Sequence, residues 1–456
     1  MGGLDRPAWK RGWNRVTGLF GPLLALAAVT AFFAASDRWF ADGTFATSLN
    51  LRTVTVQTCV VAVAALGMTL IIIAGGIDLS AGTALALCAT TLAWGLREDV
   101  AHLAIHGDNF ARASLRLEDA QKRLATAKRS GVSDPTALED RAAGARQRLV
   151  ALLEQKLADA RTRAKPPGAQ DAPGAATKPA GTNKDPTVVL ERKLDRLRAA
   201  DFQLRVDPLW LEGAPNSTWT APCAVAIGIG TGLLAGLFNG LLISSLRIAP
   251  FVVTLGSMTM FLGLGNLLSG NVPVRPSFAQ IPTWLGDLDG NTPDVLWLGF
   301  PTGVWLAALL AIVVAVVLRY TVFGRYVFAL GSNESAARLC GINVAATKAA
   351  IYALGGALFG MAGVYQFARL STGNPMSGAG LELEVIAAVV IGGGSLSGGR
   401  GTVLGTLAGA AMTAVIKSGC TQLGLSDALQ RIILGVIIIC AVMIDQLRQR
   451  RLTAGN

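Results

Sequence analysis

The chain has 456 residues, of which 52% are hydrophobic and 15% charged, and its mean hydropathy is +0.49. Such a composition excludes an ordinary soluble domain and is typical of helical proteins that cross the membrane several times. The net charge of +11 does not indicate nucleic-acid binding, because basic residues accumulate on the cytosolic side of such proteins. We therefore expect an all-α fold, that of a polytopic helical membrane protein.

Ten apolar stretches approach the roughly 20 residues that a helix needs to cross the hydrocarbon core. They are residues 17–35, 53–74, 79–96, 221–244, 250–269, 296–318, 349–368, 383–396, 402–419 and 428–446. The eighth is short and ends in glycines, so we expect it to be broken or re-entrant. The sequence thus predicts about ten transmembrane helices.

Basic residues precede the first apolar stretch, as in a signal peptide, and Ala34-Ala35-Ser36 imitates a cleavage site. The apolar stretch is long and nine more follow it, which favours an uncleaved first helix. The positive-inside rule then places the N-terminus in the cytosol, and ten crossings return the C-terminus there. The terminal basic residues behind this expectation are Arg6, Lys10, Arg11, Arg15, Arg448, Arg450 and Arg451.

A glycine-rich segment interrupts the second and third apolar stretches. Gly75, Gly76 and Gly82 permit the helix to break there. Asp78 and Ser80 can then cap the helix that follows. Transporters use broken helices beside the pathway of a polar ligand. The alternative is an ordinary cap at a tight cytosolic turn, which the parity of the spans favours for Asp78.

Residues 97–215 form a large hydrophilic insertion that holds more than half of the Lys and Arg residues. Helices are predicted at 115–128, 137–165 and 188–204, with a flexible linker at 166–186. By the count of spans the insertion lies on the external side of the membrane. It is then a lid, a contact for an external partner, or a loop insertion that the fold tolerates without an essential role. It separates the membrane segments 1–96 and 216–450. The predicted seam of its helical hairpin consists of Leu138, Ala142, Ala145, Leu149 and Leu152.

Two ladders of glycines at a spacing of four residues predict helix faces that approach other helices closely. They are Gly228, Gly232, Gly236 and Gly240, and Gly401, Gly405 and Gly409.

A short charged segment, Gly324–Lys348, lies between two apolar stretches. Ser332 or Asn333 can cap a new helix there, and Gly341 can end it in the left-handed conformation. A rigid amphipathic helix at the membrane surface is a docking element for a cytosolic protein, whereas the alternative is a well-ordered connecting loop. We expect Ala336, Leu339 and Cys340 on one face. The candidate docking residues are Ser332, Asn333, Glu334, Ala336, Ala337, Arg338, Leu339 and Gly341.

No motif predicts an enzyme. Glu382 and Glu384 form a pair of carboxylates, but at a spacing of two on a helix they diverge in direction. The turn Gly392–Gly401 imitates a phosphate-binding loop, but Arg400 and Gly401 stand where such a loop has Lys and Ser or Thr. The six cysteines are scattered without a CxxC pair, and the chain has two histidines. We therefore expect no catalytic residue, metal site or cofactor.

Several motifs, in one order, resemble the permease subunits of bacterial ABC importers for sugars, the ribose, xylose and autoinducer-2 group. They are Gly75–Gly82 (GGIDLSAG), Pro250–Gly270, Gly324–Val344, Ala368–Gly380 and Glu382–Gly405. The resemblance covers residues 17–96 and 216–450. The insertion departs from the family pattern, in which that connection is short.

The resemblance implies a permease of the bacterial inner membrane that pairs with a second permease subunit. It also implies two cytosolic ATPase subunits, which hydrolyse the ATP, and an external sugar-binding protein. In the family the ATPase grips a short coupling helix, and the matching stretch here is Ser332–Gly341. A neutral sugar needs hydrogen-bonding groups rather than a counter-charge. The candidate pathway residues are Gln57, Asn239, Asn266, Ser269 and Asn374.

Other functions stay open. Permeases for branched-chain amino acids or nucleosides share the wider fold. An ion-coupled secondary transporter needs carboxylates or Lys within the membrane. The candidates for that role, Asp78, Glu382, Glu384 and Asp445, all lie at the ends of predicted spans. A membrane-anchored scaffold whose working part is the insertion is a third alternative.

Overall fold

The computed structural model describes residues 8–40, 43–98, 117, 120–121, 124, 136–164, 190–192, 194–195, 198, 219–276, 280–289 and 300–453. The chain divides into two compact units. The first comprises residues 1–91, 227–273 and 284–456, and the second comprises residues 92–226 and 274–283.

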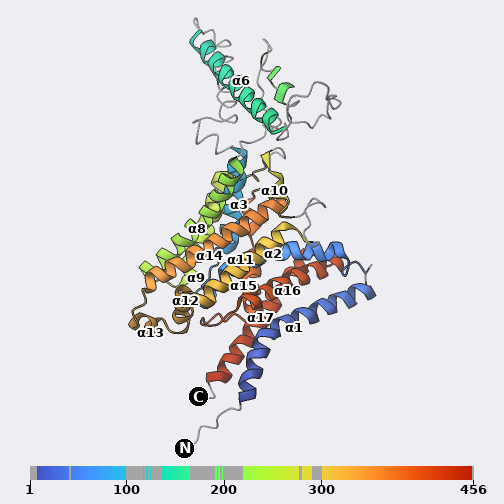
Figure 1. Cartoon of the computed structure of the whole chain (residues 1–456), viewed down its shortest axis with the longest axis vertical. Coiled ribbons are helices and arrows are strands. Elements are labelled where there is room, and N and C mark those ends of the chain that lie inside the picture. The colour runs from blue at the N-terminus through green and yellow to red at the C-terminus, as the bar shows by residue number, and fades with distance from the viewer. Residues whose placement is uncertain are drawn as a thin grey trace, which may run out of the picture. The chain divides into compact units, whose positions relative to one another are not determined.

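The described regular structure is helical apart from isolated bridge residues, which confirms the all-α fold (Figure 1). Each of the ten predicted stretches overlaps a helix. These helices are α1 (Ala8–Phe40), α2 (Ser48–Ile73), α3 (Ala81–Arg97), α8 (Thr220–Leu246), α9 (Pro250–Ser269), α11 (Thr302–Tyr320), α14 (Val344–Leu370), α15 (Leu381–Ile391), α16 (Val403–Gln422) and α17 (Asp427–Thr453). Shorter elements are α10 (Thr283–Gly286), α12 (Val322–Ser332), α13 (Glu334–Leu339) and the 3-10 turn η4 (Pro375–Gly378).

Six helices of the described part are long and apolar enough to cross a membrane, namely α2, α8, α9, α11, α14 and α16. This confirms a polytopic membrane protein. The helix α15 has 11 residues and is therefore only about 16 Å long, against about 30 Å of hydrocarbon. The eighth stretch is thus short, as predicted.

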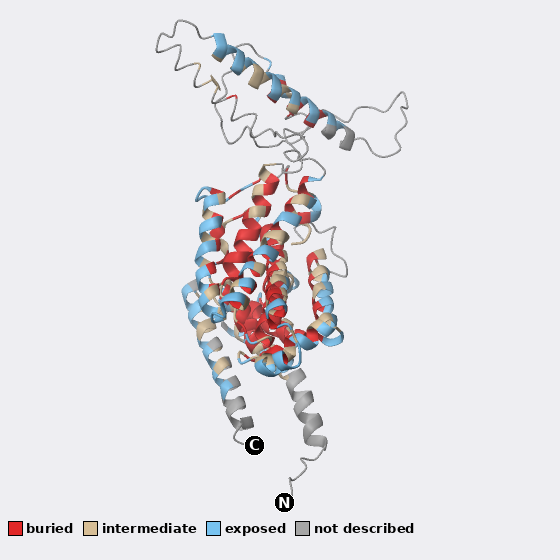
Figure 2. Ribbon diagram, turned by 90° about the vertical axis from the view of Figure 1, so that its left-hand side faces the viewer, coloured by how far each residue is buried: buried red, intermediate tan, exposed pale blue. Residues whose placement is uncertain are grey.

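The helix α2 is the centre of the first unit. Every residue from Cys59 to Ile73 is buried, and α11, α14, α15 and α16 all pack against it. A helix that is apolar on all sides can be stable only where other helices surround it. By contrast, α9 and α11 expose large apolar side chains such as Leu267 and Ile312, as expected of helices that face lipid. In Figure 2 the buried residues, in red, follow the inner helices.

Both glycine ladders lie at close helix contacts. A Cβ atom on Gly240 would lie 2.8 Å from the Ala349 Cα atom of α14, and Gly232 and Gly236 face the backbone of Gly356 in the same helix. Gly409 of the second ladder faces the Ala388 backbone of α15. Any side chain at these positions would push the backbones apart, so the ladders are packing features, as predicted.

The second unit contains α6 (Thr136–Ala164), which agrees with the helix predicted at 137–165. Its exposed residues are pale blue in Figure 2. Two ion pairs, Arg161–Glu191 at 2.5 Å and Arg198–Glu154 at 2.6 Å, join α6 to the helical residues near 190–198.

The predicted seam residues lie on the less exposed side of α6, since Leu149 is buried and Leu138, Ala142, Ala145 and Leu152 are half-buried. The buried leucines of α6 are Leu149, Leu153 and Leu157, a stripe at a spacing of four residues. Most of the helix predicted at 115–128 and the linker at 166–186 lie outside the described residues, and the side of the membrane on which the insertion lies stays a prediction.

Candidate functional site

The segment between α11 and α14 folds into two short helices, α12 and α13, separated by Asn333. The backbone of Asn333 is extended, and its Oδ1 atom accepts a hydrogen bond from the Ala336 amide at 2.9 Å. Asn333 therefore caps α13, whereas Ser332 ends α12 and donates its hydroxyl to the Phe328 carbonyl. Gly341 follows with φ +83°, the left-handed conformation that the sequence predicts.

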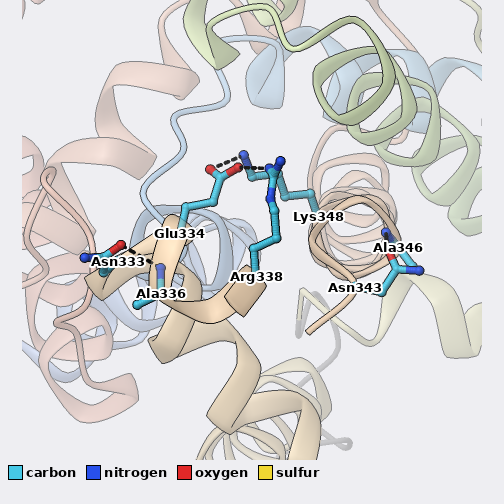
Figure 3. Close-up of polar contacts among 7 residues, drawn as sticks. All are labelled: Asn333, Glu334, Ala336, Arg338, Asn343, Ala346 and Lys348. Carbon is cyan, nitrogen blue, oxygen red and sulfur yellow. Dashed lines mark hydrogen bonds and ion pairs between the residues drawn. The ribbon is translucent and has the colours of Figure 1, made fainter. Parts of the chain in front are cut away.

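Glu334 joins α13 to the first turns of α14 (Figure 3). Its Oε2 accepts from Lys348 Nζ at 2.6 Å, and its Oε1 accepts from Arg338 at 3.1 Å. The hydrogen bond from Lys348 is the main reason that the pKa of Glu334 lies below its ordinary value, against the opposing effect of partial burial. Asn343 caps α14 by accepting from the Ala346 amide at 3.1 Å. The Glu334–Lys348 ion pair therefore links α13 to α14, and the Asn343 cap defines where α14 begins.

One side of α13 is buried and the other is free. Ala337 is buried against the body of the unit. The predicted apolar face, Ala336, Leu339 and Cys340, is exposed, and Leu339 is 90% exposed. A leucine so exposed at the end of a charged, capped helix is a suitable anchor for another protein.

A groove of about 640 Å³ runs beside α13, between it and the loop that follows α8. Arg247 of that loop, together with Arg338 and Lys348, gives the groove a basic lining, and Glu334 is its acidic residue. Its surface therefore suits a partner with carboxylates.

Asp78 lies in the break between α2 and α3. It is 1% exposed, and its Oδ1 accepts from the Ser80 amide at 2.8 Å and from the Ser80 hydroxyl at 2.5 Å. Asn239 of α8 donates to Ser80 Oγ at 2.9 Å and to Asp78 Oδ2 at 3.4 Å. Asp78 thus bonds within the tight turn between α2 and α3, as a local cap does, and the packing of α8 over the break buries it. A role for Asp78 beside a ligand pathway stays a prediction.

A junction of three backbone segments connects this break to α12. Gly75, with φ +82°, faces Gly331 near the end of α12. The turn after α15 also reaches the same place, since the Gly399 amide donates to the Ile73 carbonyl at 2.8 Å. Gly76 packs beneath the Tyr352 ring of α14. The glycine-rich turn at Gly392–Gly401 is therefore a packing element at the end of α2, which agrees with the rejection of a phosphate-binding loop.

A chamber of about 380 Å³, lined by both polar and apolar residues, lies between α2, α14, α15, α16, α17 and the loop before α15. Its lining includes Gln57 of α2, Gln366 of α14 and Thr413 of α16. Gln366 and Thr413 are buried, and the buried Gln57 Oε1 atom has no hydrogen-bond partner among the described residues. The chamber therefore offers hydrogen-bonding groups to a polar ligand.

Of the five predicted pathway residues, Gln57 is the one that lines this chamber. Asn239 is instead bonded to the Asp78 segment, and Ser269 donates to the Asn266 carbonyl within α9. Asn374 caps η4 by accepting from the Met376 amide at 3.0 Å.

The chamber is also lined by four polar or charged residues that were not among the predicted pathway residues, Gln366, Arg369, Thr413 and Lys417. The spacing of these residues in the sequence is the signal that indicates them. Gln366 and Arg369 are three residues apart in an apolar helix, and Thr413 and Lys417 are four apart in another, so each pair lies on one helix face.

The protein family described as the branched-chain amino acid transport system / permease component matches residues 204–442. The chain belongs to this family. Several curated relatives of the permease are named for sugars. The ribose import permease protein RbsC of Escherichia coli is 38% identical over 226 residues, which is 50% of this chain and 69% of that protein.

Two further relatives extend the comparison. The fructose import permease protein FrcC of Rhizobium meliloti is 35% identical over 223 residues, 49% of this permease and 62% of that protein. The L-arabinose ABC transporter permease protein AraH of Azospirillum brasilense is 36% identical over 236 residues, 51% of this permease and 67% of that protein. No solved structure matches the chain. The resemblance to sugar permeases that the motifs indicate is thus confirmed.

Proposed function

We propose that the protein is the membrane-spanning subunit of an ATP-driven importer of the bacterial inner membrane. It translocates a monosaccharide that an external binding protein delivers, and it works as a dimer of two permease subunits. The observation that carries this proposal is the similarity to permeases named for ribose, fructose and arabinose. These names favour a sugar over the branched-chain amino acids of the family's description.

The chamber supports the same choice. Amide and hydroxyl groups from Gln57, Gln366 and Thr413 line it, and such groups suit the hydroxyls of a sugar better than a branched aliphatic side chain. The ion-coupled alternative receives less support, since each of the three buried carboxylates among the described residues, Asp37, Asp78 and Glu382, accepts a hydrogen bond from a nearby residue. Asp37 Oδ2 accepts from the Phe45 amide at 2.7 Å. Asp78 accepts from Ser80, and Glu382 accepts from the Gly380 amide at 3.1 Å.

In this proposal α13 is the coupling helix on which the cytosolic ATPase docks. Leu339 enters an apolar pocket of the ATPase, while the basic groove beside α13 faces acidic residues of the same partner. Because the Glu334–Lys348 ion pair links α13 to α14, a movement of the ATPase on α13 is passed to α14. The two permease subunits then alternate between outward-facing and inward-facing states.

The test is the variant Leu339→Asp. Since Leu339 is 90% exposed, the substitution leaves the melting temperature of the purified permease unchanged. Burying a leucine is worth about 1.5–3 kcal/mol, so the affinity for the ATPase, measured with purified proteins in detergent, falls at least about tenfold. ATP-driven sugar uptake into proteoliposomes falls with it.

Met376→Asp is the matched control, because Met376 is also an exposed apolar residue but lies in η4, beyond the far end of α14. It leaves the affinity for the ATPase unchanged. If Leu339→Asp binds the ATPase as tightly as the unsubstituted protein, α13 is not the coupling helix.

A further inference from the structure

The chamber between α2, α14, α16 and α17 contains more positive than negative charge. Three basic residues line it, Arg369, Lys417 and Arg431, together with one acidic residue, Glu384. Lys417 and Glu384 form an ion pair at 3.2 Å. Within the described part of the chain, no carboxylate lies within ion-pair distance of Arg369 or Arg431. The two guanidinium groups are therefore available to a ligand.

A more distant carboxylate does not remove this excess. Asp289 interacts electrostatically with Arg369, and it does so with Arg52 as well. Asp289 thus shares its one negative charge between two arginines and is not part of the chamber lining. The region around Arg369 remains net positive.

The position of these cations is unusual for a membrane protein. The helix α14 begins at Val344 beside α13, and Gln366 lies about 33 Å further along its axis at about 1.5 Å per residue. The chamber therefore lies at the opposite end of the unit from the coupling helix, on the side that the proposed function makes external. Lys and Arg are depleted on that side by the positive-inside rule, so a converging set from α14, α16 and α17 needs a separate reason.

We propose that the chamber binds an anionic monosaccharide, a sugar that carries a carboxylate or a phosphate group. The sugar hydroxyls bond to Gln57, Gln366 and Thr413, and the acidic group lies between Arg369 and Arg431. A guanidinium group matches the two oxygens of a carboxylate or phosphate with two parallel hydrogen bonds. The unpartnered Gln57 Oε1 atom accepts from a hydroxyl. This inference rests on the proposed function and narrows its substrate class.

The test uses the full-length permease in phosphatidylcholine nanodiscs and matched pairs of radiolabelled ligands. The pairs are glucose with glucuronate, galactose with galacturonate, and glucose with glucose 6-phosphate. The members of each pair share a sugar ring and differ at one terminal position, so the comparison isolates the acidic group and separates carboxylate from phosphate. We expect one acidic ligand to bind at least about tenfold more tightly than its neutral partner, since hydrogen bonds to charged groups are the strong ones.

Arg369→Gln and Arg431→Gln each reduce the affinity for the acidic ligand by about tenfold and leave the affinity for its neutral partner unchanged. Both side chains are exposed, so the variants fold, which their melting temperatures verify. Arg325→Gln is the control, because Arg325 is an exposed arginine of α12 near the coupling helix.

The proposal is refuted if no acidic ligand binds more tightly than its neutral partner, or if the arginine variants bind the acidic ligand as tightly as the unsubstituted permease does. In that case ATP-driven uptake of a neutral sugar still supports the proposed function, so the two failures are distinguishable. A third result also overturns it. If phosphatidylglycerol in the nanodiscs abolishes binding of the acidic sugar, the site belongs to a lipid headgroup.

Discussion

Gly331→Ala tests whether the junction between α2 and α12 depends on the absence of a side chain. A methyl group at this position would overlap the Ile73 carbonyl oxygen and lie 2.6 Å from the Gly399 nitrogen. Both are backbone atoms, so no side-chain rotation relieves the overlap. The two helices must separate, and the hydrogen bond from Gly399 to Ile73 (2.8 Å) must lengthen.

Three contributions set the size of the effect. Forcing a methyl into a filled site costs about 1–3 kcal/mol, and the lost hydrogen bond costs about 1 kcal/mol. Replacing Gly by Ala within a helix returns about 1 kcal/mol. The net loss of stability is therefore about 1–3 kcal/mol, which corresponds to a fall in melting temperature of about 1–3 °C for a chain of this length.

The assay is thermal unfolding of the purified protein in detergent, with Gly263→Ala as the control. Gly263 lies within α9, and a Cβ atom there has no neighbour within 4 Å. The control therefore shows the gain in helix propensity without the overlap, and its melting temperature stays equal or rises slightly. If Gly331→Ala melts like Gly263→Ala, the close contact at the junction does not exist.

Two further predictions concern the other polar groups. Asp78→Ala leaves the buried Ser80 amide without its acceptor and lowers the free energy of unfolding by about 2–3 kcal/mol. Asp78→Asn keeps an oxygen acceptor and retains most of the stability. Equal melting temperatures for the two variants would contradict this prediction. The folded-state pKa of Glu334 lies below its ordinary value of 4.5, so the stability that its ion pairs contribute is complete above about pH 4.5 and disappears as the pH falls through the folded-state pKa. Because the Glu334 side chain is 42% exposed, that contribution is only about 0.5 kcal/mol. If the melting temperature of Glu334→Gln depends on acid pH in the same way as that of the unsubstituted protein, the ion pairs of Glu334 do not contribute this stability.

Local signals were sufficient for the helices and for α13. The apolar stretch 250–269 coincides with α9, which begins at a proline and ends at a left-handed glycine. Asn333 and Gly341 likewise determine where α13 begins and ends through their own side chain and backbone. Each of these features depends on residues a few positions apart, so the sequence pattern contains the necessary information.

The polar sites depend on contacts between distant segments. Asp78 is buried because Asn239 of α8 packs over it, and nothing near Asp78 in the sequence indicates that contact. The chamber also depends on contacts between distant segments, since Gln57 comes from α2 and Lys417 from α16. Polar residues in an apolar helix show that a polar neighbour exists, but the packing of the helices decides which neighbour it is.

The central helix α2 has a consequence for how the two ends of the protein affect each other. It carries Gln57 in the chamber and ends at Ile73 in the junction with α12, and between them its residues are buried on all sides. Such a strut has no room to bend. If the ATPase on α13 changes the affinity of the chamber for its ligand, thermodynamic reciprocity requires that the ligand change the affinity of α13 for the ATPase by the same factor. In that case an occupied chamber changes the affinity of α13 for the ATPase before any ATP is hydrolysed.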